Sequence, residues 1–293
     1  MKENQTMRND ILTWACVAAL VALPTLAAPA AAVKPVVVTL TFDDGPRGHA
    51  TEVAPLLEKY RFPATFNVVT DKVGKPGFLT WDDIRSLYRD GFEIASHTVT
   101  HPNLAALMKE GKADAVRREI VESRDAIARE IGVAPKFLCH PGIQTSPAVE
   151  DLIRACDMEP MATCRRNFGA ETVPGTATSV GAFLDSLDPE KTPAVDILFH
   201  GVSPTSGGWS AMTNASYFAK SVEEIAQRVR SRKIRVVGYP EFHRLARTKD
   251  ITKDWLVQPV AVPKGWTLEK EIPCDESKWT KGDFAGSIPL PPD

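Results

Sequence analysis

The chain has 293 residues, of which 43% are apolar and 25% are charged. These are the fractions of an ordinary soluble globular protein, and the length suffices for one large domain or two small ones. The formal net charge is −2 at pH 7, which argues against a broad basic surface for nucleic acid or anionic lipid. A neutral partner, such as an uncharged sugar polymer, is compatible with this balance.

The N-terminus has the layout of a secretory signal peptide. Basic residues precede an apolar run over residues 11–26, and Ala30 and Ala32 form an A-x-A cleavage site. We therefore predict that residues 1–32 are a signal peptide and that the protein is secreted or periplasmic, with no stable membrane insertion after cleavage. A retained membrane anchor is the alternative, which Pro24 and the alanine-rich end disfavour.

Of the five cysteines, Cys16 would leave with the signal peptide. Cys139, Cys156, Cys164 and Cys274 would remain, and an even number in an oxidising compartment allows up to two disulfides. The sequence does not choose among the three pairings. The spacing lacks paired C-x-x-C knuckles, which argues against a structural zinc site.

From residue 36 onward, short β-branched runs alternate with helical patterns. Strands are predicted at residues 36–42, 64–69, 92–95, 137–139, 161–164, 196–199 and 234–237. Helices are predicted at residues 51–60, 81–89, 113–131, 147–155 and 217–230.

About seven strand–helix alternations predict a parallel α/β architecture. No glycine-rich phosphate loop follows the first strand, which favours a distorted (β/α) barrel of about seven parallel strands over a dinucleotide-binding sheet. We expect a single domain over residues 33–248. Residues 249–293 are rich in Pro, Trp and Lys and are expected to pack on the domain surface as an extension.

Two adjacent carboxylates end the first predicted strand, in the sequence TFDDGP over residues 41–46. Catalytic groups of α/β barrels lie at the C-terminal ends of strands. Side chains alternate along an extended backbone, so Asp43 and Asp44 point in different directions, and one can bind a metal while the other stays free as a base. Solvated carboxylates in a simple turn are the alternative.

Two histidines follow the third predicted strand. His97 and His101 are four residues apart, and they converge on one point if the segment forms a helical turn, a spacing used in metal ligation. Two incidental polar loop residues are the alternative interpretation. The chain has only six histidines, however, and two of them fall four apart at a strand end.

One carboxylate and two imidazoles make the ligand set of a catalytic metal site, which keeps positions open for water and substrate. We expect one divalent ion, zinc first, with cobalt, manganese or nickel as alternatives. Such an ion would lower the pKa of its water and polarise a carbonyl group. The second aspartate could then take the proton of the water.

The sequence TFDDGP at residues 41–46, followed by SHTVTHPNL at residues 96–104, resembles the first two signature motifs of the polysaccharide deacetylases, the NodB-homology carbohydrate esterases. Residues 64–66 and 90–94 also fit the family pattern, and the similarity extends over residues 36–245. The resemblance implies a distorted (β/α) barrel and a metal-dependent hydrolase that removes acetyl groups from an N- or O-acetylated poly- or oligosaccharide.

The resemblance also implies a role for each matching residue. The general base is Asp43, and the metal ligands are Asp44, His97 and His101. The sequence DILFH, which ends at His200, matches a late strand of the family that ends in Leu-x-His. His200 is then the general acid that protonates the leaving amine or alkoxide.

The third motif departs from the family pattern. Cys139 stands where an arginine can steady the catalytic aspartate, Pro141 is retained, and Gly142 replaces a tyrosine whose backbone N–H helps to hold the oxyanion. Backbone donation needs no particular side chain, so Gly142 can still supply this N–H. His140 either lines the cleft or packs inertly.

The fourth motif, which supports the acid histidine in the family, has no clear match. Arg165 or Arg166 lies at the corresponding strand end, and either can face the site. Cys139 and Cys164 can be adjacent strand ends, which would allow a disulfide between them. Trp209, in a Gly-Gly-Trp-Ser loop, is the candidate to stack on a sugar face.

Two alternative functions remain. A cyclic-imide or ureide-like amide hydrolase of the same superfamily is disfavoured by the intact Asp-His-His set and the export signal. A carbohydrate-binding protein without activity is disfavoured because binding alone needs neither the base Asp43 nor the acid His200. The polysaccharide, the choice between N- and O-acetyl, the role of the extension and the oligomeric state stay open.

Overall fold

The computed structural model describes residues 34–161, 165–168, 179–204 and 212–246. The expected signal peptide at residues 1–32 and the expected extension at residues 249–293 lie outside these ranges, so both stay predictions. In the described ranges, no helix combines the length and the apolar character that crossing a bilayer requires.

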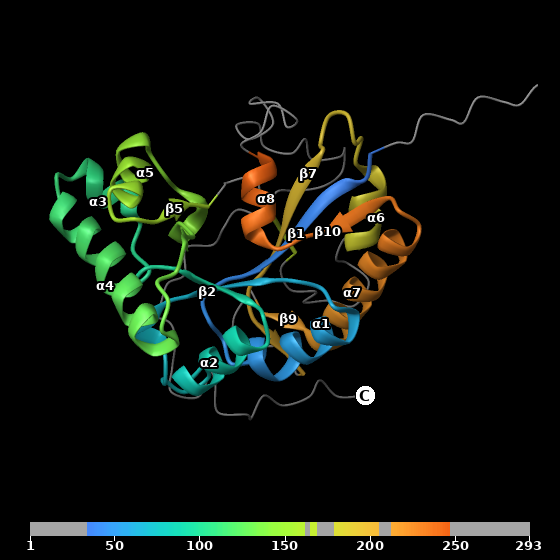
Figure 1. Cartoon of the computed structure of the whole chain (residues 1–293), viewed down its shortest axis with the longest axis horizontal. Helices are drawn as coiled ribbons and strands as arrows, with labels where there is room; N and C mark the ends of the chain where they lie inside the picture. Colours follow the sequence, from blue (N-terminus) through green and yellow to red (C-terminus); the bar gives the residue numbers. More distant parts are fainter. Residues whose placement is uncertain (1–33, 162–164, 169–178, 205–211, 247–293) are drawn as a thin grey trace, which may run out of the picture. The chain divides into compact units, whose positions relative to one another are not determined.

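The chain forms a parallel sheet with the strand order β5-β4-β3-β2-β1-β7-β6, and β10 is a further partner of β1 (Figure 1). The apolar run at residues 36–42 becomes β1 near the middle of this order, where it is almost entirely buried, as parallel sheets with both faces covered require. The bounds are β1 Val36–Phe42, β2 Thr65–Val68, β3 Glu93–Ser96, β4 Phe137–Leu138, β5 Glu159–Pro160, β6 Arg165–Asn167, β7 Ala194–Phe199 and β10 Ile234–Val236. A separate short pair consists of β8 Val202–Ser203 and β9 Thr213–Asn214.

The sheet is an incomplete barrel. Residues 36–38 of β1 pair with β10 and residues 41–42 pair with β2, so these two strands share one edge of β1 while β7 occupies the other. Within the described ranges, β5 and β6 end the strand order and do not pair with each other. The predicted distorted (β/α) barrel with parallel strands is confirmed.

All five predicted helices are present, and local sequence explains their ends. α4 (Ala113–Ile131) stops at Gly132, whose φ of 82° is a left-handed conformation that glycine adopts without strain. α2 (Trp81–Arg89) begins after Thr80, which forms a capping box with Asp83. The other helices are α1 Ala54–Tyr60, α3 Leu104–Lys109, α5 Pro147–Arg154, α6 Val180–Ser186, α7 Ala215–Arg230 and α8 Tyr239–Ala246.

Some elements differ from the prediction. The helix predicted at residues 51–60 begins as a π-helical turn, η1 (His49–Val53), before α1. α3, α6 and α8 are additional; they have 6, 7 and 8 residues, which is too short for a clear apolar stripe. The strand predicted at residues 161–164 falls largely outside the described ranges, and β6 begins at Arg165.

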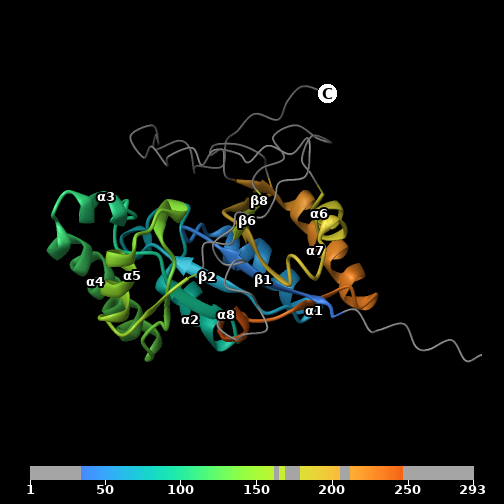
Figure 2. The same cartoon turned by 90° about the horizontal axis from the view of Figure 1, so that it is seen from above.

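Alternation along β1 separates the two faces of the sheet. Val38, Leu40 and Phe42 belong to the main apolar core, which also contains residues of α1, α2 and α7. Thr41 and Asp43 alternate with them and therefore lie on the opposite face. In both views, α3, α4 and α5 group beside the β3–β5 side of the sheet, and α6 and α7 lie together on the other side (Figures 1 and 2).

The opposite face of the sheet is closed at one end by α8. Tyr239 and Phe242 of this helix are fully buried and pack with Phe137, Cys139 and Ala194 in a smaller apolar cluster. Above this cluster, toward the C-terminal ends of the strands, the inner face carries polar side chains.

Candidate functional site

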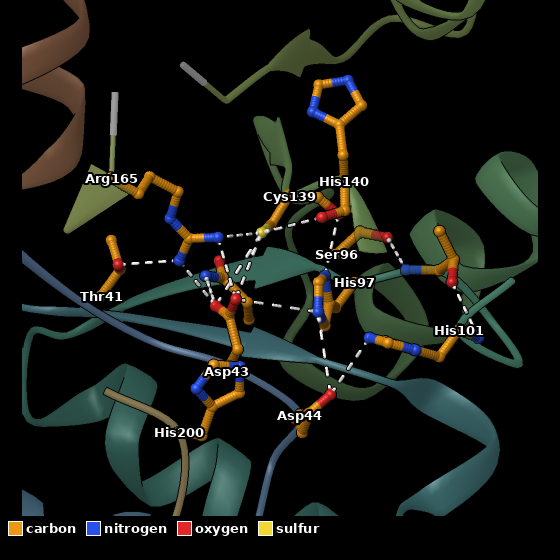
Figure 3. A network of polar contacts seen from close by, with 12 residues as sticks. Thr41, Asp43, Asp44, Ser96, His97, His101, Cys139, His140, Arg165 and His200 are labelled. Carbon is orange, nitrogen blue, oxygen red and sulfur yellow. Dashed lines mark hydrogen bonds and ion pairs between the residues drawn. The ribbon is translucent and has the colours of Figure 1, made fainter. Parts of the chain in front are cut away.

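The polar residues identified from the sequence gather at one edge of the sheet. Asp43 directly follows β1, His97 follows β3, Cys139 follows β4 and His200 follows β7. The C-terminal ends of parallel strands meet at the same edge, which is where ligands bind in α/β folds. Figure 3 shows these side chains, together with that of Asp44, around one region.

Asp44, His97 and His101 form a compact set of metal-ligand donors. One donor atom from each residue lies within 4.8 Å of the other two. Oδ1 of Asp44 is 3.3 Å from Nε2 of His101 and 3.8 Å from Nε2 of His97. This oxygen is buried and accepts no hydrogen bond from the described residues, so it lacks the partner that a buried carboxylate normally has. Two imidazoles and one carboxylate therefore fit a divalent transition metal.

The two histidines converge through a loop, so the expected helical turn is wrong. Thr98 and His101 have positive φ values of 70° and 66°, and the His101 N–H donates to Oγ1 of Thr98 at 3.0 Å. Glu119 on α4 holds this loop from outside. Its Oε2 accepts hydrogen bonds from the N–H groups of Val99 and Thr100 at 2.8 and 2.9 Å.

The orientation of His97 is fixed by the neighbouring strand. Its Nδ1 lies 2.9 Å from the carbonyl oxygen of Cys139, so Nδ1 carries the proton of the neutral ring and donates to that oxygen. Nε2 then presents its lone pair to the ligand set. Burial lowers the pKa of His97 to about 4, because the charged imidazole is poorly solvated there. The ring is therefore neutral, as a metal ligand must be.

The two adjacent carboxylates face different neighbours, as alternation predicts. Both lie near His97, but Asp44 also faces His101, whereas Asp43 faces Arg165 of β6 (Figure 3). Asp43 also faces Asn67 of β2. Nδ2 of Asn67 donates to Oδ1 of Asp43 at 2.5 Å. Asp44 leaves the strand with a φ of 73°, a left-handed conformation that redirects its side chain away from that of Asp43.

Arg165 binds both oxygens of Asp43. Its two terminal nitrogens donate to Oδ2 and Oδ1 at 2.9 and 2.8 Å. Its Nε donates to Oδ2 of Asp196 on β7 at 3.1 Å, and the Arg165 side chain is only 3% exposed. Of the two arginines considered from the sequence, Arg165 thus faces the site, whereas Arg166 stacks over the rings of Phe168 and Phe183.

The charges around Asp43 favour its ionised form. Burial opposes ionisation, but the positive charge of Arg165, with smaller effects from His97 and His200, holds the pKa of Asp43 well below its usual range. Burial raises the pKa of Asp196 to about 6 and that of the Cys139 thiol well above its ordinary value. Asp43 is therefore the ionised group beside the ligand set.

Cys139 is a free thiol within the described ranges, as is Cys156. The disulfide considered between Cys139 and Cys164 involves a residue outside these ranges, as does any pairing with Cys274. Asp43, His97 and Cys139 also lie close enough to offer three donors to an ion. Arg165 already contacts both Asp43 and Cys139, so a cation there would meet a buried positive charge.

His200 lies beside both carboxylates (Figure 3), and its charge helps to lower the pKa values of Asp43 and Asp44. Its backbone is held by η1. His49 is fully buried, and its Nε2 is 2.8 Å from the carbonyl oxygen of His200. The preceding Gly48 allows this close approach, because a Cβ there would be 1.8 Å from the carbonyl oxygen of Val202.

The other residues selected from the sequence are less tightly connected to this cluster. His140 is buried, and its ring points away from the ligand set (Figure 3). Pro141 and Gly142 lie in the short helix η3 (Pro141–Ile143), where Gly142 is exposed and has a φ of 66°. Trp209 lies outside the described residues, so its role stays a prediction.

Three residues of the network were not singled out from the sequence as site residues: Thr41, Asn67 and Asp196. Oγ1 of Thr41 donates to Oδ1 of Asp196 at 2.7 Å, and all three side chains are buried. The sequence could have indicated Asp196, because an acidic residue inside an otherwise apolar strand needs a buried partner. Asn67 gives a weaker signal of the same kind in β2.

Residues 30–161 match the model of the family described as polysaccharide deacetylase. The chitooligosaccharide deacetylase of Rhizobium leguminosarum bv. trifolii is 40% identical over 89 residues, which are 30% of this chain and 38% of that protein. The peptidoglycan-N-acetylglucosamine deacetylase of Bacillus cereus is 32% identical over 106 residues, which are 36% of this chain and 35% of that protein. The chain thus matches less than half of the length of these relatives.

Solved structures extend the similarity over most of the described chain. The family 4 acetyl xylan esterase from Clostridium thermocellum, in complex with a cobalt ion, is 25% identical and superposes with a TM-score of 0.52. That alignment covers 71% of this chain and 91% of the esterase. The Xyl-CE4 domain of a xylanase from the hindgut metagenome of Trinervitermes trinervoides has the same fold, with 23% identity, a TM-score of 0.51 and coverage of 72% and 90%.

Proposed function

We propose that the protein is a metal-dependent hydrolase that removes acetyl groups from an N- or O-acetylated poly- or oligosaccharide, as the match of residues 30–161 to the polysaccharide deacetylase model supports. The observation that carries the proposal is the pairing of two adjacent aspartates with separate surroundings. Asp44 lies with His97 and His101 in a donor set, while Asp43 is held ionised beside that set by Arg165. Hydrolysis of an acetyl group with a metal-activated water uses a metal site together with a base next to it.

The residues that would hold the ion are Asp44, His97 and His101. Zinc is the first candidate for two imidazoles and one carboxylate, and cobalt, manganese and nickel accept the same donors. The cobalt ion of the acetyl xylan esterase supports a divalent metal of this kind. When bound, such an ion makes water more acidic and polarises a carbonyl oxygen.

Asp43 is the proposed general base. Its carboxylate is ionised, is fixed from two sides by Arg165 and Asn67, and can accept the proton of the attacking water. The water's oxygen adds to the acetyl carbonyl carbon, and the negative charge moves to the carbonyl oxygen. The N–H group of Gly142 is the proposed hydrogen-bond donor to this oxyanion.

His200 is the proposed general acid. Its ring lies near both carboxylates (Figure 3). A protonated imidazole there can donate its proton to the nitrogen or oxygen of the sugar as the bond to the acetyl carbon breaks. Acetate and the free amine or hydroxyl are the products.

Acetate release by the purified protein tests this proposal. The substrates are N-acetylated oligosaccharides and acetylated xylan, each with zinc or cobalt and each with a chelator. We expect release that needs the metal and that disappears in the Asp43→Asn variant, because the amide cannot accept the water's proton. Absence of release from every substrate, with metal bound, would contradict the proposal and favour a cyclic-imide hydrolase or a non-catalytic carbohydrate-binding protein.

We also propose that the protein is exported. The basic start, the apolar run and the A-x-A site within residues 1–32 support this localisation. Mass spectrometry of the protein from the secreted or periplasmic fraction should find a chain that begins at Val33. A full-length chain in the membrane fraction would contradict cleavage.

A further inference from the structure

We propose that Arg165 of β6 is the positioning residue that selects Oδ2 of Asp43 as the base atom. This inference rests on the proposed function, because it assigns a task to a residue in contact with the base. The family resemblance directs attention to position 139 on β4 for an arginine of this kind, and position 139 is a cysteine here. The positive charge reaches Asp43 from a different strand.

The pocket around the guanidinium matches all of its hydrogen-bond donors. An arginine has five N–H donors in a fixed plane. Nε donates to Asp196, one terminal nitrogen donates to Oδ2 of Asp43 and contacts Sγ of Cys139 at 2.8 Å, and the other donates to Oδ1 of Asp43 and to Oγ1 of Thr41. Each donor has its own acceptor, so the guanidinium has one orientation.

The anchoring side of this pocket is independent of Asp43. Asp196 is fully buried and accepts hydrogen bonds from Nε of Arg165 and from Oγ1 of Thr41, at 3.1 and 2.7 Å. Oγ1 of Thr41 in turn accepts from Arg165 at 2.8 Å. Asp196 and Thr41 therefore fix the guanidinium on β7 and β1, and the fixed guanidinium fixes Asp43.

The two oxygens of Asp43 differ in how many strong hydrogen bonds they accept. A carboxylate has about four lone-pair positions, two on each oxygen. Oδ1 accepts from Asn67 and from Arg165, which fills both of its positions. Oδ2 accepts one strong hydrogen bond, from Arg165 at 2.9 Å, and its other contact is the Cys139 thiol, a weak donor 3.7 Å away. Oδ2 also lies 3.9 Å from Nε2 of the ligand His97. The oxygen with fewer strong hydrogen bonds is thus the one that faces the donor set.

The small side chain of Cys139 leaves room for the guanidinium of Arg165. Cys139 is 1% exposed, and its Sγ lies 3.8 and 3.7 Å from the two oxygens of Asp43. An arginine at this position would have to occupy the volume of the Arg165 guanidinium and would place two like charges in contact. A small residue after β4 is therefore required when the arginine comes from β6.

The matched variants Arg165→Lys and Arg166→Lys test the inference. The two positions are adjacent, and both substitutions keep the positive charge. A lysine at 165, however, cannot bind both oxygens of Asp43 and also reach Asp196. We expect Arg165→Lys to lower kcat for acetate release about 100-fold, with KM and metal affinity within about threefold of the native protein. Arg166, which stacks on Phe168 and Phe183, should tolerate lysine with kcat within about threefold.

Chemical rescue separates positioning from folding. In Arg165→Ala, guanidinium chloride at about 20 mM, far below denaturing concentrations, should restore kcat at least about tenfold, whereas sodium or ammonium chloride should not. If Arg165→Ala does not fold, the kcat of Arg165→Lys decides. Two results would overturn this inference while leaving the proposed function in place, provided that the native protein releases acetate. One is an Arg165→Lys variant with the kcat of the native protein. The other is a folded Arg165→Ala variant whose kcat guanidinium does not raise. Absence of release from the native protein would overturn the proposed function and this inference with it.

Discussion

Asp44 is the only charged member of the proposed ligand set, and its Oδ1 is buried without a hydrogen bond from the described residues. Replacing it by asparagine keeps the shape and removes the charge, so we expect the affinity for zinc or cobalt to fall by more than about 100-fold. Asp71→Asn is the control, because Asp71 is exposed and pairs with Lys75 on the surface. Isothermal titration of both variants checks this; equal affinities in the two would rule out Asp44 as a ligand.

At the residue scale, the sequence indicates the donor set but not the residue that holds the base. Asp43, Asp44, His97 and His101 stand in distinctive spacings at strand ends, and the structure brings them together. Arg165 and Arg166 are adjacent in a three-residue strand of polar residues, so no apolar alternation shows which of them faces inward. Only the pairing of β6 with β7, which sets Arg165 opposite Asp196, decides between them.

At the scale of elements, the loop between β3 and α3 depends on α4. Glu119 accepts hydrogen bonds from two backbone N–H groups of this loop, and its Oε1 also accepts one from the hydroxyl of Thr100 at 2.7 Å. We expect Glu119→Ala to loosen the loop that carries His101 and to weaken metal binding about 10- to 100-fold, as changes in residues that support metal ligands typically do. Glu122→Ala, an exposed position on the same helix, is the control. A Glu119→Ala variant with native metal affinity would contradict this role for α4.

The elements also show where sequence patterns stop being informative. The long stripe of α4 and the apolar run of β1 appear as predicted, because a buried face leaves a clear periodicity. The i, i+4 spacing of His97 and His101 was correct as a sign of convergence and wrong as a sign of a helix. Thr98 and His101 take left-handed backbone conformations, which non-glycine residues adopt only when surrounding contacts hold them. Glu119, which holds this loop, belongs to a helix that begins more than ten residues after His101. The sequence of the loop itself therefore does not reveal these contacts.

At the scale of the whole molecule, buried histidines make stability depend on pH. Burial lowers the pKa values of His49, His97 and His140 to about 4 in the folded state, whereas they titrate near about 6.5 in an unfolded chain. Between these values the unfolded chain binds more protons, so the free energy of unfolding rises with pH by about 1.4 kcal/mol per pH unit for each histidine. Asp196, whose pKa burial raises to about 6, acts in the opposite direction and offsets one histidine.

Urea unfolding of the metal-free protein between about pH 4.5 and 6.5 measures this slope. We expect stability to fall as the pH is lowered through this range. His49→Gln can keep a side-chain N–H for the carbonyl oxygen of His200 and does not titrate, so its slope should be smaller by about one proton. A native protein whose stability is constant over this range would contradict the burial of neutral histidines.

The most direct test of a metal-dependent deacetylase is to follow acetate release while chelator-treated protein is titrated with zinc or cobalt. Release should be absent at the start, rise in proportion to added metal and stop rising at one ion per chain, the number expected if Asp44, His97 and His101 hold the ion. The Asp44→Asn variant should stay inactive over the same concentrations. Full acetate release by metal-free native protein would contradict the metal-dependent mechanism, and so would equal activation of the Asp44→Asn variant.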